Sequence, residues 1–164
     1  MLFRSDNIFP HHESEIAQSE GATGKTFVRY WLHNRHLLVN GEKMSKSLGN
    51  FYTLKDLLKK GYSAKAIRYL MLSANYRTSL NFTEEGLKNT EKTVNGLIDF
   101  VDKIRELKIN GSSNEKINKK INEVKKRFEE SMDDDLNTSL ALAAIFELIN
   151  ETNKAIDEKN VSEK

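Results

Sequence analysis

The sequence predicts a mainly α-helical protein with a small β portion towards its N-terminus. Apolar residues recur at helical spacing through most of the chain after residue 63. Short aliphatic and aromatic runs bounded by turn-forming residues occur before about Ser79. The 164 residues suffice for one domain, or for two small pieces, with a modest hydrophobic core.

The N-terminal part is expected to contain the end of a strand near Phe9 and then a helix over residues 11–20. Pro10 fixes the backbone angle φ of the turn between them. Gly21 is expected to end the helix, because glycine commonly follows the last helical residue.

Two short strands are expected next, over Phe27–Leu32 and His36–Val39, because both runs are rich in β-forming residues. Asn40 and Gly41 then form a turn. The aromatic residues of the first run are expected to be core residues, and a base-stacking platform is the alternative.

Five further helices are predicted from capping residues and apolar periodicity. Thr53, Ser63 and Asn137 are suited to be N-caps, and Gly61 is suited to end the first of these helices. A polar, glycine-containing loop is expected over residues 110–114. The expected helices cover residues 53–60, 63–75, 83–107, 117–132 and 137–156.

Composition narrows the functional classes. The hydrophobic fraction is 38%, the charged fraction 30% and the net charge +2, values ordinary for a helical protein and too polar for a membrane span. The N-terminus lacks a secretory pattern, so a cytoplasmic location is expected. The absence of cysteine excludes disulfides and thiolate metal ligands within these residues.

A lysine-rich loop follows the Asn40–Gly41 turn. It places two lysines, Lys43 and Lys46, three residues apart and intersperses them with serines. A mobile ammonium group of this kind stabilises the negative charge that develops on a departing pyrophosphate. The alternative from spacing alone is a solvated turn.

His11 and Glu15 stand four residues apart in the predicted first helix and therefore project from one face of it. Imidazole and carboxylate at this spacing can share one metal ion. The alternative is a pair of surface histidines at a helix start.

Longer strings around both motifs resemble a known family. Residues 43–47, Lys-Met-Ser-Lys-Ser, match letter for letter the ATP loop of class I aminoacyl-tRNA synthetases, and Leu48-Gly49-Asn50 continues as in that family. Residues 9–19 resemble the zinc-site helix of cysteinyl-tRNA synthetases, with Ser14 where that family usually has Asn. Residues 128–138 resemble part of the helical region that follows its catalytic domain.

The resemblance implies roles for individual residues. Lys46 would contact ATP and stabilise pyrophosphate, and Lys43 would support it. Zn²⁺ would be held by two cysteines together with a histidine and a glutamate, which match His11 and Glu15 here, and Mg²⁺ would accompany ATP. The implied ATP-binding residues are Lys43, Met44, Ser45, Lys46 and Ser47.

The resemblance also implies an organisation in three parts. Residues 1–52 would be the C-terminal remnant of a Rossmann-like catalytic domain, residues 53–82 stem-contact helices and residues 83–164 a helical bundle that binds tRNA. The partners would be ATP, cysteine and tRNA(Cys), with no membrane, a monomeric parent and possible self-association of the fragment. A tRNA-facing surface would include Lys119, Lys120 and Lys126.

The implied reaction is ATP-dependent formation of cysteinyl-adenylate and transfer of cysteine to tRNA. The sequence contains neither the His-Ile-Gly-His type of motif nor the two zinc thiolates, so this chain alone is expected to be inactive. Two alternatives are a noncatalytic helical tRNA-binding or interaction module, and a relative that ligates cysteine to an amino sugar.

Overall fold

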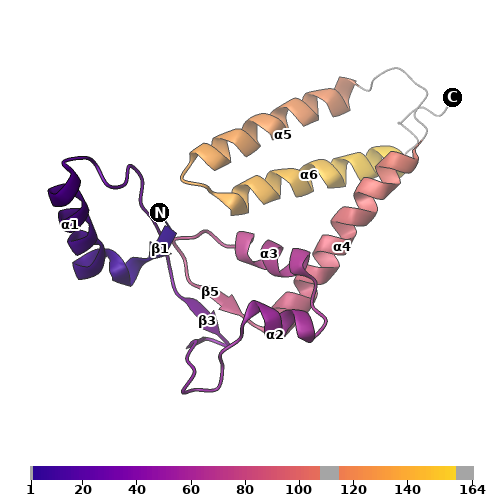
Figure 1. The fold of residues 1–164 in the computed structure, drawn as a ribbon. Coiled ribbons are helices and arrows are strands. Elements are labelled where there is room, and N and C mark those ends of the chain that lie inside the picture. Colours follow the sequence, from indigo (N-terminus) through magenta and orange to yellow (C-terminus); the bar gives the residue numbers. More distant parts are fainter. Residues whose placement is uncertain (1, 108–114, 158–164) are drawn as a thin grey trace. The chain divides into compact units, whose positions relative to one another are not determined.

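The computed structural model describes residues 2–107 and 115–157, which are mostly helical (Figure 1). The chain divides into two compact units. The first unit comprises Met1–Thr53 and Tyr76–Thr83, and the second comprises Leu54–Asn75 and Glu84–Lys164. The expected loop over residues 110–114 lies outside the described residues.

The first unit begins with β1 (Leu2–Arg4), which pairs in parallel with β2 (Leu32–Asn34). Between these strands lie a 3₁₀ turn, η1 (Ser5–Asn7), an irregular helical turn, η2 (Ile8–His12), and α1 (Glu13–Thr23). This path places the His-Glu motif at the junction of η2 and α1.

A second small sheet carries the lysine loop. Its central strand β3 (Leu37–Val39) pairs antiparallel with β4 (Glu42–Lys43) and parallel with β5 (Leu80–Phe82). The buried side chains of Val39 and Phe82 occupy opposed positions in the register. The turn at Asn40 and Gly41 is confirmed, and both residues have positive φ, 52° and 82°.

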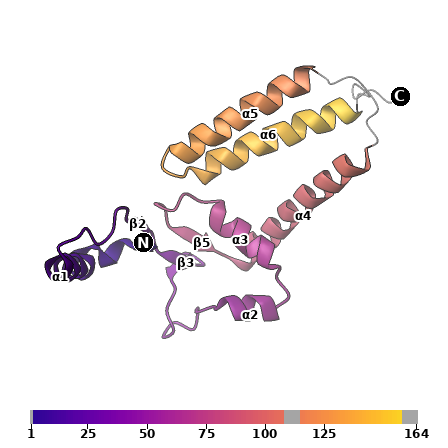
Figure 2. The same cartoon turned by 45° about the horizontal axis from the view of Figure 1, so that its top comes forward.

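The second unit is helical. Helix α3 packs on α4, and α5 packs along α6 as a helical hairpin (Figure 2). Its core includes Ala66, Leu87, Val94, Val124 and Ala144. The bounds are α2 (Leu54–Lys59), α3 (Ala64–Leu72), α4 (Glu84–Glu106), α5 (Glu115–Asp133) and α6 (Thr138–Asp157).

Local capping explains where several of these helices begin. The Ser63 hydroxyl accepts a hydrogen bond from the Ala66 amide at 3.1 Å, and the Asn137 side chain accepts one from the Leu140 amide at 3.3 Å. Both residues therefore cap as expected. Gly61 follows α2 with φ +91° and supplies the left-handed residue that ends it.

Two expectations for the start of the first unit are wrong. Phe9 ends no strand; it has extended angles within η2, and β1 is over by Arg4. Gly21 lies inside α1, which ends instead at Thr23 and is capped by Gly24, where φ is +62° and the amide donates to the Glu20 carbonyl. Both glycines are compatible with a helix end, so local sequence alone did not distinguish them.

The expected strand over Phe27–Leu32 is also wrong, because only Leu32 belongs to a strand. Pairing with the three residues of β1 begins at Leu32 and continues to Asn34, so the partner strand sets the position of β2. Tyr30 is 78% exposed and is not a core residue. β5 was not expected, and α3 ends at Leu72 rather than near Asn75.

Among the helices of residues 2–107 and 115–157, none combines the length and the apolar character needed to cross a membrane.

Candidate functional site

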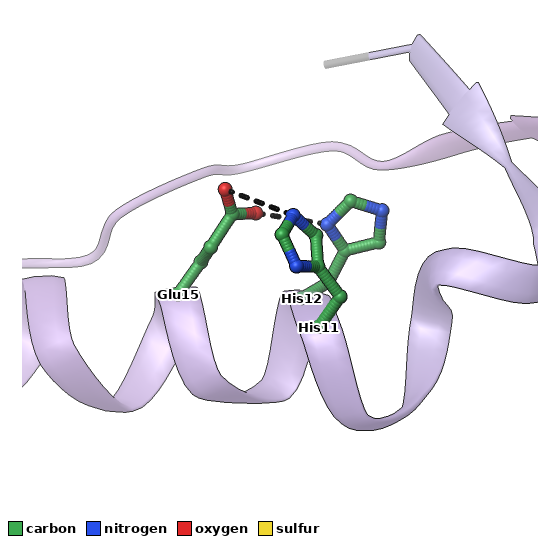
Figure 3. A group of neighbouring side chains, drawn as sticks. All are labelled: His11, His12 and Glu15. Atoms are coloured by element: carbon green, nitrogen blue, oxygen red, sulfur yellow. Dashed lines mark hydrogen bonds and ion pairs between the residues drawn. The ribbon is translucent and has the colours of Figure 1, made fainter.

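Three side chains at the junction of η2 and α1 bring potential metal ligands together (Figure 3). His11 Nε2 lies 3.6 Å from Glu15 Oε1, and His12 Nδ1 lies 2.9 Å from Glu15 Oε2. Their ligand atoms all lie within 4.8 Å of one another. The structure therefore brings together His11 and Glu15, as expected, and adds His12.

The two histidines have different surroundings. The His11 side chain is 63% exposed, whereas His12 as a residue is only 2% exposed. Since a carboxylate only accepts hydrogen bonds, the short contact to Glu15 assigns the proton to His12 Nδ1. His12 thus orients the carboxylate, and His11 and Glu15 face solvent with lone pairs available to an ion.

His12 was not among the residues expected from the sequence, although its position three residues before Glu15 was a usable signal. Two aromatic rings bury His12: the ring centroid of Trp31 lies 4.7 Å from that of His12, and the centroid of His33 lies 5.3 Å from it. His33 Nε2 is buried and makes no hydrogen bond within the described part of the chain. A buried imidazole nitrogen without a partner is available for a ligand.

A cavity of about 660 Å³ lies beside this aromatic cluster in the first unit. Trp31 and His33, whose rings contact His12, also line this cavity. At one wall, His36 Nε2 lies 3.6 Å from Asp6 Oδ2. Its volume is in the range of small-molecule sites, and its lining offers an aromatic surface and groups of both charges.

The lysine loop extends from the β3–β4 hairpin. Asn81 of β5 accepts a hydrogen bond from the Gly41 amide at 2.8 Å and anchors the hairpin turn. Lys43 ends β4 and Lys46 lies in the following turn, and both are exposed. Lys46 Nζ lies 5.5 Å from the ring centroid of Phe51. Both ammonium groups are accessible to an anion.

The three lysines of α5 do not form one cluster. Lys119 and Lys126 are seven residues apart, so they share a helix face, and both are exposed. Lys126 Nζ lies 3.7 Å from Glu130. Lys120 faces α6, where it donates to Glu147 at 2.6 Å, and its side chain is only 20% exposed.

The ion pairs between α5 and α6 explain two pKa shifts. The hydrogen bond to Glu147 raises the pKa of Lys120. The same bond, together with one from Arg127, lowers the pKa of Glu147 below its usual 4.5. Lys120 therefore stays charged and paired within the hairpin.

Comparison with known families identifies the class to which this site belongs. Residues 4–92 match the family described as tRNA synthetases class I (C) catalytic domain, and residues 127–164 match the DALR domain. The first match covers more than half of the chain and includes both the His-Glu cluster and the lysine loop. The chain belongs to the class I tRNA synthetase family.

The individual relatives that the chain resembles are cysteine–tRNA ligases. The chain is 48% identical over 159 residues to the cysteine–tRNA ligase of Protochlamydia amoebophila, covering 97% of this chain and 33% of the relative. It is 47% identical over 159 residues to that of Chlamydia muridarum, covering 96% of this chain and 34% of the relative. The cysteine–tRNA ligase of Brachyspira hyodysenteriae is 46% identical over 159 residues, with 96% and 34% covered. The chain thus spans about a third of the length of these relatives.

Proposed function

We propose that this chain supplies one part of a cysteine–tRNA ligase, which activates cysteine with ATP and transfers it to tRNA(Cys). The similarity to cysteine–tRNA ligases over 159 residues carries the proposal. Residues 1–52 would complete the catalytic domain, residues 53–82 would form stem-contact helices and residues 83–164 the tRNA-binding bundle. The reaction takes place in the cytoplasm, and the parent is a monomer.

In this proposal the lysine loop serves adenylate formation. The cysteine carboxylate attacks the α-phosphate of ATP, and the bond to pyrophosphate breaks. Lys46 stabilises the charge that develops on the pyrophosphate, Lys43 supports it, and Met44, Ser45 and Ser47 complete the ATP-binding segment. The exposure of both ammonium groups supports this role. Mg²⁺ accompanies the nucleotide.

His11 and Glu15 would provide two of four zinc ligands, and two thiolates from the rest of the parent would complete the set. The imidazole and carboxylate donors fit zinc, and the buried His12 holds Glu15 in place. Bound zinc would supply direct recognition of the substrate thiol. The adjacent cavity, with Trp31 and His33 in its wall, is suited to receive the amino acid.

The activity is tested by ATP–pyrophosphate exchange with cysteine. The chain alone is expected to give no exchange, because the reacting groups must be positioned by both parts of the site. Mixing it with the portion of the Protochlamydia amoebophila relative that it does not match is expected to restore exchange. Lys46→Ala should then lower the rate about 10²–10³-fold, whereas Lys25→Ala, an exposed lysine outside the loop, should not.

Two results would reject the proposal. Robust exchange by the isolated chain would show that the missing part is dispensable. If the chain with Lys46→Ala were as active in the mixed assay as the unsubstituted chain, the loop would not act on pyrophosphate.

For tRNA, we propose that the surface including Lys119, Lys120 and Lys126 faces the phosphate backbone. Lys119 and Lys126 carry the direct contacts, because Lys120 is already paired with Glu147. Changing Lys119 and Lys126 to Glu should weaken tRNA binding at low salt and reduce its salt dependence. Lys154→Glu on α6 is the control, and undiminished affinity of the double variant would contradict the assignment.

A further inference from the structure

One amide side chain closes the lysine loop. Asn50 donates from Nδ2 to the Lys43 carbonyl at 3.2 Å, and its Oδ1 accepts from the Ser45 amide at 2.8 Å. It is half-buried and lies directly after Gly49, where φ is +67°. An amide offers a donor and an acceptor on one planar group, so it can satisfy both backbone partners at once.

The other hydrogen bonds of the loop lie within its tip. The Ser45 and Ser47 hydroxyls are 2.8 Å apart, and the Ser47 amide donates to Ser45 Oγ at 3.3 Å. The Gly49 amide donates to the Lys46 carbonyl at 3.2 Å. These bonds shape the turn, whereas the bonds of Asn50 tie that turn to the end of β4.

The clamp formed by Asn50 has consequences for both lysines. Lys43 contributes its carbonyl to the clamp, so its backbone is held where β4 ends. Lys46 directly follows Ser45, whose amide the clamp holds, and its ammonium rests over the ring of Phe51. A weak contact of this kind is readily exchanged for a phosphate group.

We propose that Asn50 is a positioning residue of the lysine loop, which fixes the backbone between Lys43 and Lys46 so that both ammonium groups reach one polyphosphate. This inference rests on the proposed ATP-binding role of the loop. Asn50 itself need not touch the nucleotide; it acts through the Lys43 carbonyl and the Ser45 amide.

Amide hydrogen exchange in the 164-residue chain tests the clamp. Asn50→Ala should speed exchange of the Ser45 amide at least about tenfold, as expected when a protecting hydrogen bond is lost. Asn50→Asp keeps an acceptor for Ser45 but removes the donor to Lys43, so it should retain most of the protection. Asn89→Ala, on the exposed surface of α4, is the matched control and should change nothing at Ser45.

Binding of inorganic pyrophosphate at low salt, followed by NMR titration, tests the positioning role. Asn50→Ala should weaken binding several-fold with an unchanged melting temperature. Unchanged Ser45 exchange in Asn50→Ala would overturn the clamp whatever the loop binds. Faster exchange with undiminished pyrophosphate binding would overturn the positioning role. If Lys46→Ala also binds pyrophosphate normally, the proposed ATP role of the loop fails with it.

Discussion

At the scale of single residues, Glu15 is the side chain on which the metal cluster depends. Each of its oxygens faces a different histidine, His11 at 3.6 Å and His12 at 2.9 Å. The contact from buried His12 restricts the carboxylate before any ion arrives, which lowers the entropy cost of binding. Glu15 therefore offers carboxylate oxygens to a metal ion, and the contact with His12 already orients that carboxylate.

Zinc binding by the chain should depend on this carboxylate. We expect weak binding, because His11 and Glu15 alone cannot form a closed site. Glu15→Gln should lower the affinity by about 10-fold or more, since the neutral amide loses the charge attraction. Glu13→Gln, an exposed neighbour, should leave it unchanged. Calorimetric titration with Zn²⁺ measures both, and equal affinities in the two variants would exclude Glu15 as a ligand.

Sequence spacing was sufficient to predict the proximity of His11 and Glu15, because a helix brings residues four apart onto one face. It was not sufficient for His12. The burial of His12 depends on Trp31 and His33, whose positions follow from the pairing of β2 with β1. Such long-range packing has no local signal.

At the scale of secondary-structure elements, ion pairs join the two helices of the α5–α6 hairpin. Glu147 of α6 accepts hydrogen bonds from both Lys120 and Arg127 of α5, and these bonds lower its pKa below 4.5. Because the folded state then holds its proton less tightly than the unfolded state, Glu147 stabilises the fold above pH 4.5. That stabilisation is lost as the pH falls through the lowered pKa.

Glu147→Gln should therefore lower the melting temperature at neutral pH. The difference in melting temperature from the unsubstituted chain should disappear as the pH falls well below 4.5. Glu151→Gln on the same helix removes a pair with Lys154 and should have a smaller effect, because Glu151 pairs within its own helix rather than with α5. Thermal unfolding between neutral and acid pH measures this. A pH-independent difference for Glu147→Gln would contradict the ion-pair explanation.

The elements also differ in how well the sequence predicted them. The longer helices were found because their apolar stripes repeat over many residues, as in α4 and α5. β5 was missed because its three residues are defined by their pairing with β3, far earlier in the chain. Short strands of this kind carry too few residues for a period-2 pattern.

At the scale of the whole molecule, the chain passes from one unit to the other three times. Tyr76–Thr83 belongs to the first unit, yet both of its ends continue into the second unit, from α3 and into α4. This segment contains β5, which pairs with the strand that leads to the lysine loop. The first unit therefore includes a segment whose two ends continue into residues of the second.

This connectivity predicts that the stability of the first unit is coupled to that of the second. Leu87 is fully buried in α4, so Leu87→Ala should destabilise the second unit by about 2–5 kcal/mol. Releasing α4 frees one end of β5, so the Asn40 amide, which donates to the Phe82 carbonyl at 3.0 Å, should also exchange faster. Val39→Ala in β3, within the first unit, should also speed exchange at Asn40. Hydrogen exchange in mild denaturant, where larger openings dominate, measures both variants, and an Asn40 amide unaffected by Leu87→Ala would mean that β5 holds its place without α4.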